Sequence, residues 1–376
     1  MSAEIDAALE LVFSALAEHP EKNTLNHYAD LEAGRRPRGC PVSLGRVQHW
    51  REVPETDEEK RGHFDPPEKQ VLDGLRGIPT PLEMNNNFQP VLGSCGVLPS
   101  VASAFGITPD VANPRNPGGV TGYLPLESFD YFDPPDINTA GVWPRVKEQI
   151  DCIKALTPPE IKIGYPDLQG PINTAHLILG TELFYAMKLE PARLHHLMQM
   201  ITDFYLQVFH TLPQWIGADR MIDFIGATKK LCECSVNLIS REAYREFGLP
   251  YDRQIAEFLG EIGIHTCGGK HVFEETLRGL PNVRYSEWAD VPSAFAPEIH
   301  LEAALEEIGD RPLIISGGRE LWDGDFETKI HDDLARLDDH PLQSFGYSGM
   351  RWREPDKPRI IAMRQRLDDY YVDRWG

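Results

Sequence analysis

The sequence predicts an α/β fold built on a parallel sheet, and two observations lead to this prediction. From about residue 80 onward, short apolar or β-prone segments alternate with segments whose apolar residues recur at helical spacing. Each predicted strand also ends in polar or glycine-rich sequence, as expected where parallel strands end at a functional site. A (β/α)8 barrel and an open doubly wound sheet both fit these two observations.

The predicted strands and helices follow one another in the order that repeated βα units require. The strands are expected at 161–163, 229–234, 263–267, 283–288, 313–316 and 344–347. The helices are expected at 181–187, 191–209, 240–259 and 301–308. Ser240 is a suitable N-cap for the third of these helices, and Glu242 complements the helix dipole. No glycine-rich phosphate loop follows a strand, which disfavours nucleotide binding.

The first part of the chain has a different pattern. Its opening residues carry Glu4, Asp6 and Glu10 among apolar side chains, which indicates an amphipathic helix and no signal peptide. A polar, charged stretch from Arg35 to Arg61 follows and lacks strand signals. We therefore expect residues 1–78 to form a mainly helical or irregular N-terminal extension and residues 79–376 to form the α/β domain.

Composition and charge exclude several classes of protein. The chain has 376 residues, of which 41% are hydrophobic, enough for a sizeable core. Its net charge of −21 repels phosphate backbones and anionic membranes, so nucleic-acid and membrane partners are not expected. No apolar run is long enough to cross a bilayer, and the six cysteines are too few for a disulfide framework. We expect a cytoplasmic protein.

The strongest chemical signal lies at the end of the strand expected at 263–267. His265 and Cys267 are two residues apart, so both side chains project to the same face of the sheet. Imidazole nitrogen and thiolate sulfur are preferred ligands of Zn²⁺, which in catalytic sites keeps one position open for substrate. Spacing alone slightly favours the structural interpretation, a buried cysteine and a hydrogen-bonded histidine.

Three segments resemble the uroporphyrinogen decarboxylase superfamily. Residues 238–269, LISREAYREFGLPYDRQIAEFLGEIGIHTCGG, are similar to its Ser-Pro-Glu-x-Tyr-x-x-Phe-x-x-Pro-Tyr helix followed by a strand ending His-x-Cys-Gly. Residues 165–191 and the segment NNNFQPVLGSCGVLPSVASAFG from Asn85 also resemble members of this family. Arg241 stands where the family usually has proline. The resemblance implies a (β/α)8 TIM barrel with its active site at the barrel mouth.

The motifs also indicate which of the superfamily's reactions this sequence resembles. The arginine-rich segment with which true uroporphyrinogen decarboxylases grip porphyrinogen carboxylates is missing from this sequence. The His-x-Cys strand is similar to the zinc-binding, corrinoid-dependent methyltransferases, which move a methyl group between a corrinoid protein or folate and a thiol. In that branch zinc presents the acceptor as a thiolate nucleophile. The resemblance thus implies Zn²⁺, and a corrinoid on a partner protein or a folate.

One departure from that branch affects the ligand set. Those relatives take a further cysteine ligand from the last barrel strand, whereas this chain has no cysteine after Cys267. Cys234 and Glu287 are the available replacements: Cys234 ends the preceding predicted strand on the same face as Cys232, and Glu287 ends the following one. We therefore expect metal ligation by His265, Cys267 and Cys234, and catalytic roles for Glu287 and His265.

Other side chains at strand tips are candidates for holding a small substrate, and each also has a purely structural interpretation. The amide cluster around Asn87 could orient a polar group, or simply form a turn. Arg319 follows a glycine pair and could hold a carboxylate, or form a surface salt bridge. The set of predicted substrate-binding residues is Asn87, Asp167, Gln169, Arg319 and Tyr347.

Three functions stay open at this point. The first is a zinc-dependent methyltransferase-like enzyme that transfers a methyl group between a corrinoid or folate carrier and a thiol or other small acceptor. The second is a lyase or decarboxylase acting on a small carboxylated substrate, with Glu287 or His265 as proton donor. The third is a non-catalytic barrel that binds a tetrapyrrole or corrinoid. The sequence leaves the oligomeric state open, and a homodimer is plausible.

Overall fold

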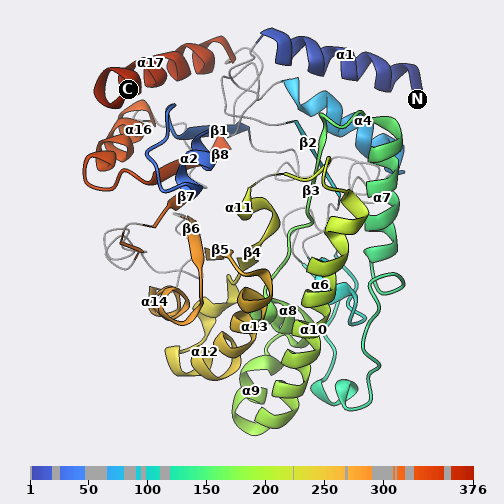
Figure 1. Ribbon diagram of the computed structural model, residues 1–376. Helices are drawn as coiled ribbons and strands as arrows, with labels where there is room; N and C mark the ends of the chain where they lie inside the picture. The colour runs from blue at the N-terminus through green and yellow to red at the C-terminus, as the bar shows by residue number, and fades with distance from the viewer. Residues whose placement is uncertain are drawn as a thin grey trace.

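Parallel strands lie at the centre of the molecule, with helices around them (Figure 1). The computed structural model describes residues 2–18, 26–46, 66–79, 90–94, 99–110, 119–222, 224–266, 270–289, 308–309, 311–317, 326–350 and 357–376. The strands in these residues are β1 Val42–Arg46, β2 Val91–Gly93, β3 Lys162–Gly164, β4 Lys230–Cys232, β5 Ile262–Thr266, β6 Val283–Ala289, β7 Leu313–Gly317 and β8 Gln343–Met350. All six predicted strands are therefore confirmed, with shifts at their ends.

Helices connect and cover the strands. The α-helices are α1 Ser2–Glu18, α2 Asn26–Glu32, α4 Pro67–Gly77, α6 Ser100–Ser103, α7 Trp143–Leu156, α8 Pro171–Leu179, α9 Glu182–Leu189, α10 Pro191–Ile216, α11 Ile225–Thr228, α12 Arg241–Phe247, α13 Leu249–Leu259, α14 Lys270–Gly279, α16 Phe326–Ala335 and α17 Lys357–Trp375. Single 3-10 turns are η4 Leu126–Phe129, η5 Ser235–Leu238 and η6 Arg336–Asp338. The helix predicted at 301–308 lies almost entirely outside the described residues.

The strand order is that of repeated βα units. A six-stranded sheet has the order β1-β8-β7-β6-β5-β4, and β2 pairs with β3. Every pairing between these strands is parallel. The loop after β3 joins the two sheets: Gln169 bridges Cys232 in parallel, and the Gly170 N–H donates to the Cys232 carbonyl at 2.8 Å. The protein thus has an α/β fold with parallel strands. The described residues include no pairing of β1 with β2, so these contacts do not show a closed barrel.

The N-terminal segment contains a strand, contrary to the sequence-based prediction. β1 lies within residues 1–78 and pairs with β8, with Val42 opposite Phe345. Helix α17 holds it there: the Arg364 guanidinium, 2% exposed, donates to the carbonyls of Val42 and Cys40. The Tyr371 hydroxyl donates to the Pro37 carbonyl at 2.5 Å. Expecting no strand in this stretch was wrong, because pairing with a distant strand stabilises a short segment that lacks a local signal. The domain boundary at 78/79 stays a prediction.

The predicted helix over 240–259 is broken into α12 and α13. It begins as predicted, since the Ser240 hydroxyl accepts a hydrogen bond from the Ala243 N–H at 3.2 Å. The break falls at Gly248, where a Cβ atom would lie 2.3 Å from the Tyr244 ring. Pro250 follows in the first turn of α13, where a missing N–H has no cost. The break lets α13 change direction and pack against α10 and α14.

The core is continuous around the long helix α10. Apolar residues along one side of α10, among them Leu194, Leu197, Ile201 and Val208, have no exposed surface. They lie at the helical spacing that the sequence predicts. Helix α10 contacts α7, α8 and α13, so these helices pack together beside the sheet.

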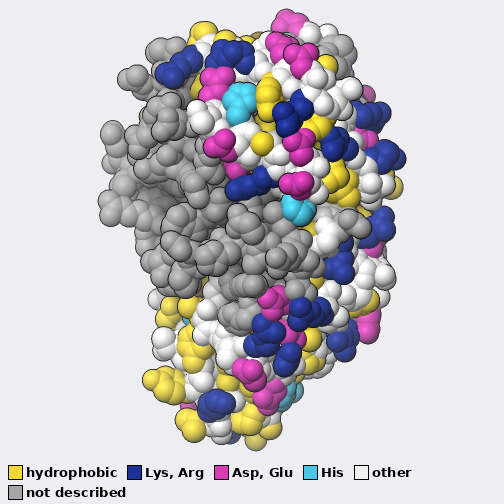
Figure 2. Space-filling view, turned by 90° about the vertical axis from the view of Figure 1, so that its left-hand side faces the viewer, with side chains coloured by type: hydrophobic (Ala, Val, Ile, Leu, Met, Phe, Trp, Pro, Cys, Tyr) yellow, Lys and Arg dark blue, Asp and Glu magenta, His cyan; other side chains and the backbone are white. Residues whose placement is uncertain are grey.

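The remaining features of the fold concern the two ends of the chain and the charged side chains on the surface. Helices α1 and α17 lie at the same end of the molecule, so the two ends of the chain are on one side of it (Figure 1). Basic and acidic side chains are interspersed over the described part of the face shown in Figure 2, and neither kind gathers into one large patch. Among the described helices, none is both long enough and apolar enough to cross a membrane.

Candidate functional site

The register of the sheet brings chemically active residues from three strands into one row. Cys232 in β4 is the Cα partner of His265 in β5, and His265 is the partner of Glu287 in β6. Residues aligned in this way project their side chains to the same face, as does Lys230, two residues before Cys232. We call these four residues the polar row. The row lies toward the carboxyl ends of β5 and β6, where βα folds place their sites.

Three members of the polar row are joined by charge. The Lys230 ammonium lies 2.9 Å from Oε2 of Glu287, and Nδ1 of His265 lies 3.2 Å from Oε1 of the same carboxylate. Both contacts have the distance of an ion pair. The side chains of His265 and Glu287 are only 16% and 20% exposed. Glu287 therefore links a lysine and a histidine that lie 35 positions apart in the sequence.

The environment of Glu287 fixes its charge. Burial opposes ionisation, but the Lys230 ammonium and the His265 ring outweigh it and hold the pKa of Glu287 well below its usual value. The carboxylate is then ionised at neutral pH, which suits it to orienting His265 and does not suit it to donating a proton. With Nδ1 directed toward Glu287, Nε2 is the ring nitrogen that could hold a metal or a substrate proton.

Cys232 occupies the place beside His265 that sequence reasoning gave to Cys234. The predicted strand 229–234 ends instead at Cys232, and Cys234 lies beyond it in helical backbone geometry at the start of η5. The argument that both cysteines share one strand face was therefore wrong. Cys232 is 3% exposed, and its Sγ donates to Oδ1 of Asp167 at 3.5 Å. Burial raises the pKa of the Cys232 thiol well above its usual value, only partly offset by Lys230.

A cavity of about 260 Å³ borders the polar row. Asp167, Lys230 and Cys232 line it on the polar side, and Tyr165, Phe209 and Ile222 are among its apolar walls. The structure therefore places the predicted residue Asp167 beside the row. Gln169 has a structural contact instead: its Oε1 accepts a hydrogen bond from the Asn173 amide at 2.7 Å.

Behind the polar row lies a second polar cluster that sequence analysis missed. The buried Glu233 carboxyl accepts hydrogen bonds from the N–H groups of Ile172 and Asn173 at 3.1 and 3.2 Å, and so caps the first turn of α8. A Cβ atom on Gly170 would lie 2.4 Å from its Oε1, so only glycine fits there. Glu233 also hydrogen-bonds to Asp252, which accepts from the Tyr244 hydroxyl at 2.6 Å. The cluster fixes the loop that carries Asp167 against the end of β4.

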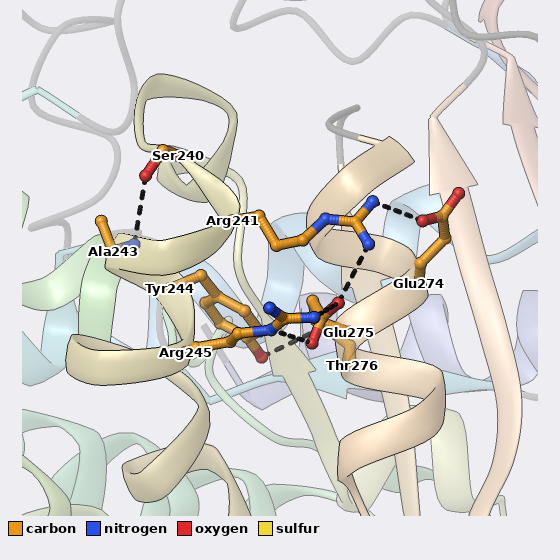
Figure 3. A network of polar contacts seen from close by, with 8 residues as sticks. All are labelled: Ser240, Arg241, Ala243, Tyr244, Arg245, Glu274, Glu275 and Thr276. Carbon is orange, nitrogen blue, oxygen red and sulfur yellow. Dashed lines mark hydrogen bonds and ion pairs between the residues drawn. The ribbon is translucent and has the colours of Figure 1, made fainter.

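Helix α14, which follows Cys267 in the sequence, is held to α12 by ion pairs (Figure 3). Arg241 reaches Glu274 at 2.5 Å and Glu275 at 3.1 Å, and Arg245 contacts both oxygens of Glu275 at 2.7 Å. Arg241, which departs from the family pattern, thus has a defined structural partner. Arg245 holds the pKa of Glu275 below its usual value, although the partial burial of Glu275 opposes this. The contacts fix the helix that follows the predicted metal ligand Cys267 in the sequence.

Several predicted site residues cannot be placed. Cys267, Asn87 and Arg319 lie outside the described residues. The Tyr347 backbone is part of β8, where it pairs with Leu44 and Gly317, but its side chain is not described. Within the described part of the chain, no three histidine, cysteine or acidic side chains are close enough together to hold a metal ion. A zinc site with His265 therefore requires ligands from outside the described residues, and Cys267 as one of them stays a prediction.

Comparison with known proteins relates the fold to a solved structure. The chain is similar to a methyltransferase from Methanosarcina mazei, with a TM-score of 0.65 and 15% sequence identity, over 93% of this chain and 99% of the other. No protein-family model and no curated protein sequence matches the chain. At this identity the likeness concerns the fold alone. The α/β architecture is thus shared with a methyltransferase over nearly its whole length.

Proposed function

We propose that the protein is a methyltransferase-like enzyme on a (β/α)8 barrel, and that it uses zinc to activate a thiol or other small acceptor. The observation that carries the proposal is the polar row, which joins Lys230, Cys232, His265 and Glu287 across three adjacent parallel strands. The sequential order of β2 to β8, with β1 beside β8, supports the barrel. The fold shared with a methyltransferase supports the reaction class.

The donor set fits zinc only in part. His265 supplies an imidazole that Glu287 orients, as carboxylates do for metal-binding histidines. We propose Cys267 as the second ligand, and Cys234 or Cys232 as the third, Cys232 being the cysteine aligned with His265. Zinc bound there would lower the pKa of a thiol acceptor and present it as a thiolate. A corrinoid on a partner protein or a folate is the proposed methyl source.

The chain's own residues have separate tasks in this proposal. Lys230 keeps Glu287 ionised, and Glu287 holds the His265 ring in one orientation. The 260 Å³ cavity has room for a small acceptor, and Asp167 and Lys230 supply polar contacts in its wall. Lys230 and Glu287 are positioning residues here, because they act through His265.

Elemental analysis of protein purified without chelators tests the metal. We expect about one zinc per chain in wild type and much less in Cys267→Ser, while Cys152→Ser, which changes a partly buried cysteine of helix α7, should keep its zinc. Methyl transfer from methylcobalamin to a thiol should be lost together with the metal. Stoichiometric metal in neither wild type nor Cys152→Ser would exclude the zinc-dependent reaction.

A decarboxylase or lyase is the second candidate, and the position of Lys230 favours it. An ammonium group in the wall of a cavity is suited to binding a substrate carboxylate. The low pKa of Glu287 leaves His265 as the proton donor in this reaction. Carbon dioxide release that survives a strong chelator and is lost in His265→Asn would favour this candidate over the methyltransferase. Tight tetrapyrrole binding without turnover would instead favour the non-catalytic alternative.

A further inference from the structure

Helix α9 exposes apolar side chains to solvent at the end of the molecule opposite α1 and α17 (Figure 1). Its inner face packs into the core through Leu183, Ala186 and Met187. Its outer face carries Tyr185 and Leu189, which are 66% and 75% exposed and lie one helical turn apart. The outer face of a surface helix is usually polar. A single exposed apolar residue is normal, but neighbouring ones need an explanation.

The segment around η4 adds an aromatic side chain to this stripe. The Leu126 N–H donates to Oε1 of Glu182 at 3.1 Å. Nη2 of Arg193 donates to Oδ2 of Asp130 at 3.0 Å. Since Glu182 begins α9 and Arg193 follows its end, residues 126–130 run alongside this helix. Tyr131 comes next and is 97% exposed. The exposed apolar side chains of this region, which we call the α9 patch, are Tyr131, Tyr185 and Leu189.

The α9 patch has an acidic border. Residues 119–144 contain four carboxylates and no lysine or arginine, so nothing within this segment offsets their charge. Glu127 and Asp133, which precede and follow Tyr131, are exposed, and neither side chain has an ion-pair partner within the described residues. Two hydrogen bonds from Asn138 lower the pKa of Asp136 and keep it ionised. The segment beside the patch is therefore negatively charged at neutral pH.

The basic groups near the patch do not cancel this charge. Arg193 already pairs with Asp130 and Glu190, which leaves Lys188 as the other lysine or arginine of residues 182–193. A second copy of this chain would bring the same acidic border and a net charge of −21, so like charges would meet. Charge complementarity thus favours a basic partner.

Arginine suits both the aromatic and the acidic part of this surface. Its planar guanidinium stacks on tyrosine rings and also pairs with carboxylates through a fork of N–H donors. Lysine has the same charge but lacks the planar group. We propose that the α9 patch binds an arginine-rich segment of a partner protein. This surface is separate from the polar row, and the proposal does not depend on the function proposed above.

Short peptides test the chemistry of the partner. Three peptides of equal length alternate glycine with arginine, lysine or glutamate, and isothermal titration calorimetry measures their binding to the full-length protein. We expect the arginine peptide to bind about threefold more tightly than the lysine peptide, because only the guanidinium stacks well on the exposed tyrosines. The glutamate peptide should not bind, because the protein repels it.

The variants locate the binding site. Tyr131→Ala/Tyr185→Ala should remove the preference for arginine over lysine, and Glu127→Gln/Asp133→Asn should weaken both basic peptides and keep the preference. Phe258→Ala is the control, because this side chain is 49% exposed on α13 and should affect neither peptide. Melting curves show whether each variant is folded.

Three results would overturn the proposal. The first is equal binding of the arginine and lysine peptides to wild type. The second is a preference that survives in Tyr131→Ala/Tyr185→Ala or is lost in Phe258→Ala. The third is a wild-type dimer, seen by analytical ultracentrifugation, that dissociates in the double tyrosine variant, because it would assign the α9 patch to a second copy of the chain.

Discussion

Polar side chains at the two ends of the strands in the six-stranded sheet differ in whether the protein provides them with partners. Toward the carboxyl ends of β5 and β6, Glu287 lies between Lys230 and His265, so its charge is compensated within the protein. At the amino end of β8, Gln343 is almost fully buried, and neither atom of its amide has a hydrogen-bond partner within the described residues. The first arrangement stabilises the fold and fixes side chains before any ligand arrives. The second leaves a donor and an acceptor buried without a partner, which costs stability.

The largest expected effect comes from removing the Lys230 ammonium that compensates the charge of Glu287. Lys230→Met should lower the free energy of unfolding by about 2–3 kcal/mol, because it leaves the largely buried Glu287 carboxylate without its main partner. Urea denaturation at pH 7 measures this. The double variant Lys230→Met/Glu287→Leu should recover part of the loss. The control is Lys229→Met, whose ammonium pairs with Glu261 at 3.5 Å near the surface; equal losses in the two lysine variants would contradict the compensation described here.

A smaller loss of stability is expected when the buried carboxylate of Asp30 is replaced. The Asp30 side chain is buried and accepts from Arg35 and Arg38 at 2.9 Å, and these hydrogen bonds outweigh burial and lower its pKa. Asp30→Asn should cost about 1–2 kcal/mol at pH 7, reduced by the exposure of both arginines.

The pH dependence of this effect has a definite sign. Since the folded pKa is lowered, the stabilisation by Asp30 is complete above its unfolded pKa of about 3.9 and is lost as pH falls through the folded value. The difference in stability between wild type and Asp30→Asn should therefore be full at pH 7 and shrink steadily as pH falls below about 3.9. Asp73→Asn, in an exposed pair with Lys69, should show almost no difference over the same range. A gap that does not shrink below about pH 3.9 would assign the effect to packing.

Replacing the unsatisfied amide of Gln343 should increase the stability of the protein. Gln343→Leu should raise the free energy of unfolding by about 1 kcal/mol, because it removes a buried donor and acceptor that the protein does not satisfy. Gln254→Leu is the comparison, since the Gln254 amide is bonded to Gln199 at 3.0 Å and its replacement should destabilise. A loss of stability in Gln343→Leu would show that bound water already meets the amide.

The smallest effect concerns the clamp between α12 and α14. Arg241→Gln should cost about 0.5 kcal/mol, because the arginine is one-third exposed and Arg245 still holds Glu275. The effect should be local: backbone amides of α14 should exchange faster with deuterium, and those of α10 should be unchanged. Uniform acceleration throughout the protein would argue against a local clamp.

Periodicity and strand ends were sufficient to predict much of the fold. The segments that became β3 to β8 are short apolar runs followed by polar tips, and both signals are local. β1 was missed because its stability comes from pairing with β8, about 300 positions away in the sequence. The break at Gly248 was missed although Gly248 and Pro250 are local signals for a helix break.

The site was predictable only in part. His265, Glu287 and Asp167 were identified because they lie near or just after the ends of predicted strands, and the structure places all three around the polar row or its cavity. Lys230 was overlooked because its ion pair with Glu287 depends on sheet register across 57 positions. Cys234 was preferred over Cys232 because the sequence does not show where β4 ends. The roles of Cys267, Asn87, Arg319 and Tyr347 stay predictions.

The position of β1 has a consequence for how the protein is made. This strand leaves the ribosome early, yet its sheet partner β8 and its clamp, Arg364 of α17, are synthesised about 300 residues later. At typical synthesis rates that is an interval of tens of seconds. During this time the edge of Val42–Arg46 has no native partner from β8. Nascent chains should thus depend on a chaperone or on temporary local contacts until β8 emerges. The pairing of β1 with β8 should be among the last folding events.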